Sequence, residues 1–341
     1  MILDKKNLFI INSPLQFLNA CEAINFFKLK NIVFLLIYNR SNKNIIQLEE
    51  QIRDLKIEVD EIIRFYPSGK SRFFKYIKLI RDLKKYAYNI VFTGEIEDSN
   101  FRIIVINLKK EKLFLLDEGT STIVDYETKI KQNKLDKYGY KEFKFLLAGL
   151  RIKFKDTINF FTYYDFEPLN YGEVIKNKLE YMRRNFQEND IDYSNTLFFL
   201  GQPMFIFSDK QEFKIILKNV INKYNYKKIF YIPHREDVDT INIIKDIYKE
   251  IEILYLNEPI EKYFLNNNIY PKHVISYSST ALVTTKILFK DCIVQYIKIK
   301  KPNTNLHTMK YLDIVYPYFD KNNILECKLV YDKNNIVNSR G

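Results

Sequence analysis

The stretch LFLLDEGTST, residues 113–122, runs from an apolar segment straight into two adjacent carboxylates, Asp117 and Glu118, and a glycine. The apolar residues predict a buried strand that ends where the charges begin. In an open parallel α/β sheet, ligands bind beyond the carboxyl ends of the strands. The stretch is therefore either a plain turn or the edge of an active site, and the surrounding sequence has to decide between them.

Strands and helices are predicted to alternate up to this stretch. Apolar runs predict strands at 7–12, 31–39, 59–67, 89–94 and 112–119, and amphipathic patterns predict helices at 13–27, 42–55, 71–88 and 99–110. Ser13 and Pro14 are an N-cap and a first-turn proline. This alternation indicates a parallel sheet whose strand ends, at Ser13, Glu95 and Asp117, share one edge.

The second half repeats the alternation. Strands are predicted at 195–203, 228–234, 251–255, 273–278 and 292–297, with helices at 209–225, 237–250, 259–265 and 279–289. The fold class is thus α/β, with two Rossmann-like βα domains that are expected to face a central cleft, a GT-B-like architecture. The predicted parts are an amino-terminal domain (1–155), a connecting or cover segment (156–194), a carboxyl-terminal domain (195–320) and a tail (321–341).

Charge and composition restrict the partners. The 341 residues carry a formal charge of +12, which attracts phosphates of nucleic acids, lipid headgroups or nucleotide sugars alike. No signal peptide or apolar run of membrane-spanning length is seen, and the three cysteines are widely separated, so we expect a cytoplasmic protein. The basic aromatic segment around 137–155 suits either an interdomain helical hairpin or a membrane surface.

Three further motifs in the second half could bind a ligand, and the first two of them suit an anion. His234, within YIPHRED, ends a predicted strand and either faces a phosphate or is a surface histidine. Ser278, Ser279 and Thr280 open a helix, where free N–H groups bind anions, although ordinary capping explains them equally well. Glu261 begins a short helix, where it either binds hydroxyl groups or complements the helix dipole.

Taken in order, these motifs resemble those of bacterial GT-B sialyltransferases. The motifs are DEG at 117–119, His234, PIE at 259–261 and Ser278-Ser279. SPLQFLNACEAI at 13–24 and FLGQP at 199–203 are similar to the lipooligosaccharide sialyltransferase family (glycosyltransferase family 52) and its polysialyltransferase relatives. One departure is the order Pro233-His234, followed by Arg235, where the family usually has His-Pro.

The resemblance implies inverting transfer of sialic acid from CMP-sialic acid to a sugar hydroxyl. Asp117 would be the general base, with Glu118 or Asp209 as alternatives, and His234 would assist the departing CMP phosphate. The expected donor contacts come from Gly201, Gln202, Pro233, Arg235, Glu261, Ser278, Ser279 and Thr280, and the expected acceptor contacts from Ser13, Gln16, Asn19 and Glu95. No metal or other cofactor is expected, because the leaving group is a monophosphate ester.

Other interpretations remain open at this point. Another CMP-activated acid, such as legionaminic acid or Kdo, or another nucleotide sugar could be the donor. A nucleic-acid binder is disfavoured because no helix-turn-helix, zinc module or aromatic RNA-binding signature is found. Partners beyond the donor and a surface glycan could include the anionic inner membrane leaflet and a second copy of the chain.

Overall fold

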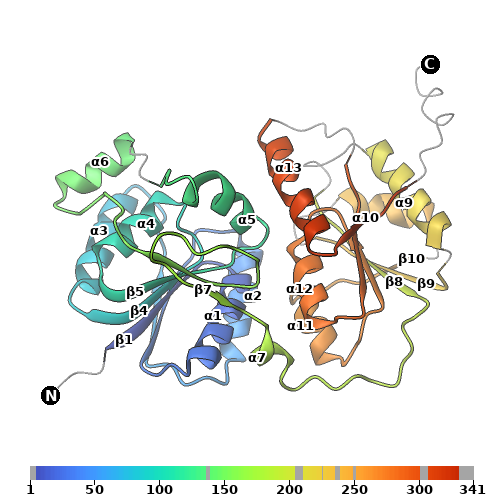
Figure 1. Ribbon diagram of the computed structural model, residues 1–341, viewed down its shortest axis with the longest axis horizontal. Helices are drawn as coiled ribbons and strands as arrows, with labels where there is room; N and C mark the ends of the chain where they lie inside the picture. Colours follow the sequence, from blue (N-terminus) through green and yellow to red (C-terminus); the bar gives the residue numbers. More distant parts are fainter. Residues whose placement is uncertain are drawn as a thin grey trace. The chain divides into compact units, whose positions relative to one another are not determined.

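The chain forms two compact α/β units in the computed structural model, Met1–Arg184 and Asn185–Gly341 (Figure 1). The structure describes residues 5–135, 139–203, 210–224, 226–234, 239–248, 251–299 and 306–329. Each unit contains one sheet in which every paired strand is parallel to its neighbours. The predicted fold class is therefore confirmed, and each unit is described by itself below.

The sheet of the first unit has the order β3-β2-β1-β4-β5-β6-β7. Its strands are β1 (Lys6–Ile11), β2 (Ile32–Ile37), β3 (Glu61–Phe65), β4 (Ala87–Thr93), β5 (Lys109–Leu116), β6 (Ile158–Thr162) and β7 (Val174–Lys176). Its helices are α1 (Pro14–Phe27), α2 (Asn42–Arg53), α3 (Arg72–Leu83), α4 (Ser99–Asn107), α5 (Ser121–Asp125), the π-helix η1 (Tyr126–Ile130), α6 (Tyr140–Leu147) and α7 (Glu180–Arg183). The strand order reverses between β1 and β4, which is where ligands bind in doubly wound sheets.

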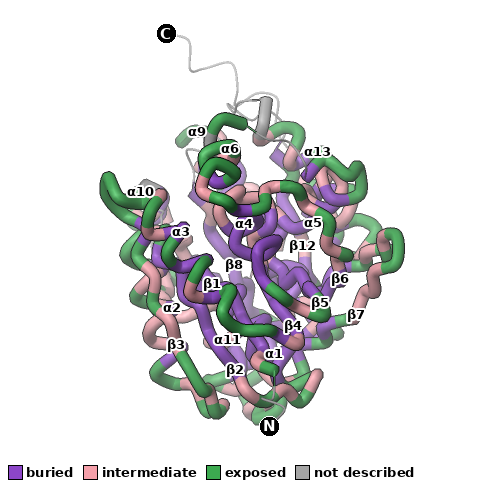
Figure 2. The backbone as a smooth tube through the Cα atoms, turned by 90° about the vertical axis from the view of Figure 1, so that its left-hand side faces the viewer, coloured by how far each residue is buried: buried purple, intermediate pink, exposed green. Residues whose placement is uncertain are grey.

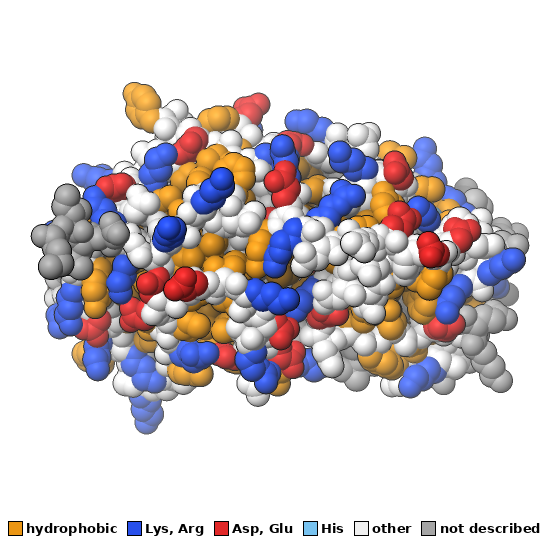
Figure 3. Space-filling view, turned by 90° about the horizontal axis from the view of Figure 1, so that it is seen from below, with side chains coloured by type: hydrophobic (Ala, Val, Ile, Leu, Met, Phe, Trp, Pro, Cys, Tyr) orange, Lys and Arg blue, Asp and Glu red, His pale blue; other side chains and the backbone are white. Residues whose placement is uncertain are grey.

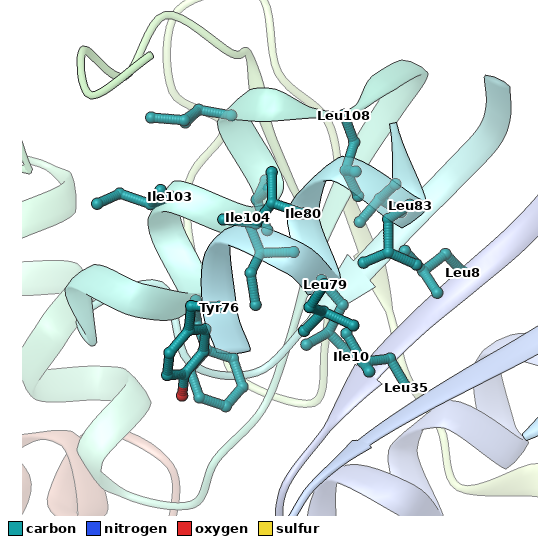
Figure 4. Packing of buried hydrophobic residues seen from close by; sticks show 14 of the residues in the cluster. Leu8, Ile10, Leu35, Tyr76, Leu79, Ile80, Leu83, Ile103, Ile104 and Leu108 are labelled. Carbon is teal, nitrogen blue, oxygen red and sulfur yellow. The ribbon is translucent and has the colours of Figure 1, made fainter. Parts of the chain in front are cut away.

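Helices cover both faces of this sheet. Alternate residues of one strand point to opposite faces, so Leu8 and Ile10 pack against α3 and α4 while Phe9 and Ile11 pack against α1 and α2. Figure 4 shows the first of these clusters, in which Tyr76 and Ile80 of α3 lie over the strands. β1 and β2 are accordingly buried along nearly their whole length, and β4 and β5 towards their carboxyl ends, as the purple stretches of the tube in Figure 2 show. Polar side chains are left to the strand ends.

The second unit has a smaller sheet of the same kind, with the order β10-β9-β8-β11-β12-β13. Its strands are β8 (Thr196–Leu200), β9 (Lys228–Ile232), β10 (Ile251–Ile253), β11 (His273–Ser276), β12 (Ile293–Tyr296) and β13 (Leu325–Glu326). Its helices are α9 (Lys210–Tyr224), α10 (Asp239–Ile247), α11 (Ile260–Asn266), α12 (Thr280–Leu288) and α13 (Leu306–Lys321). Within the described residues, no helix has the length and apolar composition that crossing a bilayer requires.

The structure differs from the sequence prediction between the two units. Residues 156–184, expected to be connecting chain, belong to the first unit, because β6 and β7 extend its sheet. The strand pattern of β6 is interrupted by Asn159, whose amide is satisfied by donating to the Leu113 carbonyl (2.9 Å) and accepting from the Glu173 N–H (3.0 Å). Among the described residues, the expected helical hairpin is a single helix, α6, followed by chain without regular secondary structure up to β6.

The predicted tail is likewise partly structured. β13 lies beyond residue 320 and pairs with β12, and it follows α13, which the sequence analysis did not predict. Ile324 and Cys327 are buried on either side of β13 although the surrounding sequence is rich in Lys and Asn. These two apolar side chains fix an edge strand that is too short to be recognised by its pattern.

A substitution at Gly172, in the turn that leads into β7, tests whether β7 pairs with β6 as described. A Cβ at this position would lie 2.1 Å from the Ile158 carbonyl oxygen, a backbone atom that cannot move without breaking β6 pairing. Gly172→Ala is expected to lower the free energy of unfolding by about 1–3 kcal/mol, measured by thermal unfolding followed by circular dichroism. The exposed neighbour Thr157→Ala is the control, with an expected change within about 0.5 kcal/mol; equal stability of the two variants would contradict the placement of β7.

Candidate active site

The DEG turn forms one corner of a polar network at the carboxyl edge of the first sheet. Gly119 adopts a φ of +86°, a conformation that favours glycine. The hydroxyls that follow it close the turn: the Glu118 N–H donates to Thr122 Oγ1 (2.7 Å), and Ser121 Oγ donates to the Glu118 carbonyl (2.9 Å). The GTST residues thus hold Glu118 in a fixed orientation at the end of β5.

The Glu118 carboxylate meets two groups from neighbouring strand ends. Ser13, the N-cap of α1 after β1, donates its hydroxyl to Glu118 Oε2 at 2.9 Å. Arg40, three residues after β2, donates Nη2 to Glu118 Oε1 at 2.7 Å and to Glu95 Oε1 at 3.0 Å. The structure therefore brings together three of the predicted residues, Ser13, Glu95 and Glu118.

Arg40 is a site residue that the sequence analysis did not identify. Its signal was present, because it follows the predicted strand at 31–39 and strand ends of a parallel sheet share one edge. Lys129 was not predicted either, and it carries no strand-end signal because it belongs to the π-helix that follows the DEG turn. It pairs with Glu97 and, at 3.3 Å, with Asp125, whose pKa is raised to about 6, chiefly by burial.

Asp117 lies beneath this edge rather than on it. Its side chain is 0% exposed, and its oxygens accept hydrogen bonds from Thr162 Oγ1 (2.6 Å) and the Tyr163 N–H (2.9 Å), both at the end of β6. Burial raises the pKa of this carboxyl to about 7, against the lowering effect of the two hydrogen bonds. Substrate could reach Asp117 only after these bonds are broken, whereas the side chain of Glu118 is 16% exposed.

Gln16 and Asn19, predicted to contact the acceptor, are buried as well. Gln16 Oε1 accepts from the Asn12 N–H (2.9 Å), and its side chain fills the space beside Gly94, where a Cβ would lie 2.6 Å away. Asn19 Nδ2 donates to the Asp117 carbonyl at 3.0 Å. In this conformation both residues support the edge from below, and their predicted contact with the acceptor would have to come through a rearrangement.

The second unit presents its own polar edge at the ends of β8, β9 and β11, which are adjacent in the sheet. Gln202 follows β8, and Ser278 follows β11. Gln202 Oε1 accepts hydrogen bonds from Ser278 Oγ (3.1 Å) and from the Ser278 N–H (3.3 Å). Ser279 caps α12 by accepting from the Ala281 N–H at 3.3 Å, and Thr280 is the first residue of that helix. Gly201 is packed against Tyr231, whose Oη would lie 2.3 Å from a Cβ.

The other predicted donor residues differ in their surroundings. Pro233 and His234 directly follow β9 and are half-buried, so they share the edge with Gln202 and Ser278. Glu261 is buried instead and accepts from Thr284 Oγ1 of α12 at 2.5 Å, with a pKa raised by that burial. Arg235 and Asp209 lie outside the described residues. His273, not predicted as a site residue, is buried between Tyr226 and Gln295 at the opposite end of β11.

The comparison with known families identifies the chain. A sequence profile for the family described as Alpha-2,8-polysialyltransferase (POLYST) matches residues 7–298. The chain belongs to this family. It is accordingly a glycosyltransferase of the sialyltransferase class, in agreement with the resemblance found in the sequence. A search among curated proteins finds no significant match.

Solved structures support the fold of this polysialyltransferase family member. It is similar to an α/β-galactoside α-2,3-sialyltransferase from the luminous marine bacterium Photobacterium phosphoreum, with a TM-score of 0.51, 12% identity and coverage of 95% of this chain and 99% of the other. It is also similar to LpCGTa in complex with UDP, with a TM-score of 0.54, 8% identity and coverage of 97% and 86%. At these identities the likeness shows the GT-B fold and no more.

The raised pKa of Asp117 predicts a pH dependence of stability. A carboxyl that holds its proton more tightly in the folded state stabilises the fold below its unfolded pKa of 3.8, and this contribution is lost as the pH rises through about 7. Asp117→Asn, which cannot titrate, is expected to flatten the stability profile between pH 4 and pH 7 by roughly 2–4 kcal/mol. Chemical denaturation at several pH values measures the difference, and parallel profiles of the two proteins would refute it.

Proposed function

We propose that this polysialyltransferase family member transfers a sialic acid from CMP-sialic acid to a hydroxyl of a surface glycan, of the lipooligosaccharide or capsule type, with inversion. The observation that carries the proposal is the partly exposed Glu118 carboxylate, held by Ser13 and Arg40 at the carboxyl edge of the first sheet. Family membership supports sialic acid as the transferred sugar. The polar edge of the second unit supports the binding of a donor that carries an anionic phosphate.

The reaction requires a proton acceptor and a stabilised leaving group. The acceptor hydroxyl oxygen forms a bond to the anomeric carbon of the sialic acid while the bond from that carbon to the CMP phosphate oxygen breaks. The hydroxyl proton passes to a carboxylate, and the phosphate leaves with the bonding electron pair. Catalysis therefore calls for a general base on one side and hydrogen-bond donors or positive charge on the other.

Glu118 fits the base better than Asp117. Each Glu118 oxygen accepts one hydrogen bond, from Arg40 or Ser13, and keeps a second lone pair that an acceptor hydroxyl can use. Asp117 is the residue first expected in this role, but its carboxylate is enclosed by Thr162 and Tyr163. We therefore propose Asp117 as the residue that positions the turn, and Glu118 as the residue that takes the proton.

The leaving phosphate is proposed to bind at the edge of the second unit. His234 would donate a hydrogen bond to it, and the Ser279 hydroxyl with the first turn of α12 would supply further donors. The Ser278 hydroxyl would join them by exchanging its hydrogen bond to Gln202 for one to the phosphate. Side chains of this kind can neutralise a monophosphate without a bridging divalent ion, so we propose that transfer needs no metal. Among the described residues, no group of three His, Cys, Asp or Glu side chains is placed to hold a metal ion.

The roles of Asp117 and Glu118 can be distinguished by substituting each residue in turn. Glu118→Gln keeps the size of the side chain and one acceptor oxygen for Arg40, while its NH2 group can donate to Ser13 Oγ in place of the oxygen that accepted from it. The substitution removes the base, so turnover is expected to fall by about 100-fold or more while CMP binding persists. Asp117→Asn should retain more activity than Glu118→Gln at the pH optimum. The reverse order of the two turnover numbers would return the base to Asp117, and nearly normal turnover in both would move it to Asp209.

The donor class is tested by ligand-induced thermal shifts. CMP is expected to raise the melting temperature, whereas UDP and GDP at equal concentration should leave it nearly unchanged. Stabilisation by UDP or GDP alone would refute a CMP-activated donor. CMP-Kdo and CMP-legionaminic acid as substrates distinguish the alternative donors, and full activity in EDTA is expected if no metal takes part.

His234→Ala tests the leaving-group role. Loss of the imidazole is expected to lower turnover by about 100-fold with little change in melting temperature, because the side chain is half-buried at a strand end. His273→Ala is an instructive contrast: His273 is buried in the core between Tyr226 and Gln295, so its loss should lower stability. Unchanged turnover of His234→Ala with CMP-sialic acid would contradict the proposed role.

A further inference from the structure

Helix α6 turns its apolar side outward. Tyr140, Phe143 and Leu147 follow the i, i+3, i+7 spacing of one helix face, and they are 77%, 49% and 75% exposed. Phe145, on the other side, is 4% exposed and packs into the core of the first unit. An amphipathic helix normally buries its one apolar face. Helix α6 has two: the face with Phe145 is buried, and the opposite face is not covered by any of the described residues. Figure 1 shows α6 at the outer rim of the first unit.

The start of α3, which packs against the buried side of α6, adds another exposed aromatic side chain. The ring centroids of Phe73 and Phe145 are 5.0 Å apart, which joins the first turn of α3 to α6. Phe74, whose ring contacts Phe73 at 5.5 Å, is 70% exposed. We call Phe74, Tyr140, Phe143, Leu146 and Leu147 the apolar rim face.

The two chain segments that carry the apolar rim face are rich in basic residues. The segments 68–78 and 139–155 contain nine Lys or Arg residues and one acidic residue, Glu142. Glu142 is engaged locally, because it accepts from the Gly139 N–H at 2.8 Å. By contrast, acidic and basic side chains are interspersed over the molecular face in Figure 3. The same two segments of the chain therefore carry both the exposed apolar side chains and an excess of positive charge.

This surface lies at the same edge of the first sheet as the carboxylates. The Glu142 side chain of α6 is hydrogen-bonded to Ser99, the first residue of α4. The N-cap of α4 is Asp98, only a few residues after Glu95. A flat partner that contacts the apolar rim face would therefore lie close to the site that receives the acceptor.

We propose that the apolar rim face and its basic border dock the first unit on an anionic lipid bilayer. Aromatic and leucine side chains can enter the boundary between headgroups and acyl chains while the Lys and Arg side chains meet anionic headgroups. A second copy of the chain would bring like charges together. A soluble polyanion would satisfy the basic residues but would leave Leu146 and Leu147 in water. The bilayer is the partner that uses both components.

The chain contains no tryptophan, which allows a direct test of insertion. In the full-length Leu147→Trp variant, the emission of the sole tryptophan is expected to shift to shorter wavelength with vesicles of phosphatidylcholine and phosphatidylglycerol. Tyr171→Trp, at a position 98% exposed in the same unit, is the control and should not shift. No shift at Leu147→Trp, or equal shifts in both variants, would overturn the proposal. The readout requires no activity, so it is independent of the proposed function.

Co-sedimentation with the same vesicles separates the two components of binding. Phe74→Ser with Leu147→Ser, and separately Lys144→Glu with Lys153→Glu, should each weaken partitioning by about tenfold or more. The charge control, Lys30→Glu with Lys56→Glu, changes exposed lysines elsewhere in the unit and should have a smaller effect. High salt should release the wild-type chain. If the serine variant binds normally, or if the chain binds RNA or polysialic acid through this surface but not vesicles, the bilayer proposal fails.

Discussion

A buried carboxylate ties two strand ends of the first unit together. Asp117, at the end of β5, accepts hydrogen bonds from Thr162 Oγ1 and from the Tyr163 N–H at the end of β6. A buried carboxyl without partners would be costly, so these contacts constrain both the strand register and the start of the DEG turn. The position of the next residue, Glu118, depends on that constraint. Adjacent acidic residues thus have separate tasks, one within the core and one at the surface.

The remaining contacts at this edge stabilise the negative charge of Glu118 without protonating its carboxylate or enclosing it. Arg40 lies between Glu95 and Glu118, and Ser13 donates to the second oxygen of Glu118. The pKa of Glu95 is raised, chiefly by burial, while the charge of Arg40 opposes that shift. Such an arrangement keeps a carboxylate fixed and still open to a hydroxyl group. The proposed role of Glu118 as general base requires such a fixed orientation.

The described polar edge of the second unit is formed by neutral groups. Gln202 and Ser278 hydrogen-bond to each other across the ends of β8 and β11, and α12 begins immediately afterwards. Hydroxyls and backbone N–H groups suit an anionic phosphate, just as a carboxylate suits an acceptor hydroxyl. The two edges therefore differ in charge, as the roles proposed for them in glycosyl transfer require. Both are built at strand ends because the strands themselves are buried on two faces.

Periodicity and strand-end position determined the α/β class, most strands, and a polar edge in each unit, with Ser13, Glu95 and Glu118 in the first and His234 and Ser278 in the second. Gln202 was expected only from the family resemblance. Both signals are local, since burial on two faces produces continuous apolar runs and excludes polar residues except at strand ends. Only the tertiary structure decided that Asp117 is enclosed, that Arg40 joins the carboxylates, that Glu261 turns to Thr284, and that β6, β7 and β13 extend the sheets. These features depend on which strands become neighbours, and contacts between residues distant in the chain leave no periodic signal in the sequence.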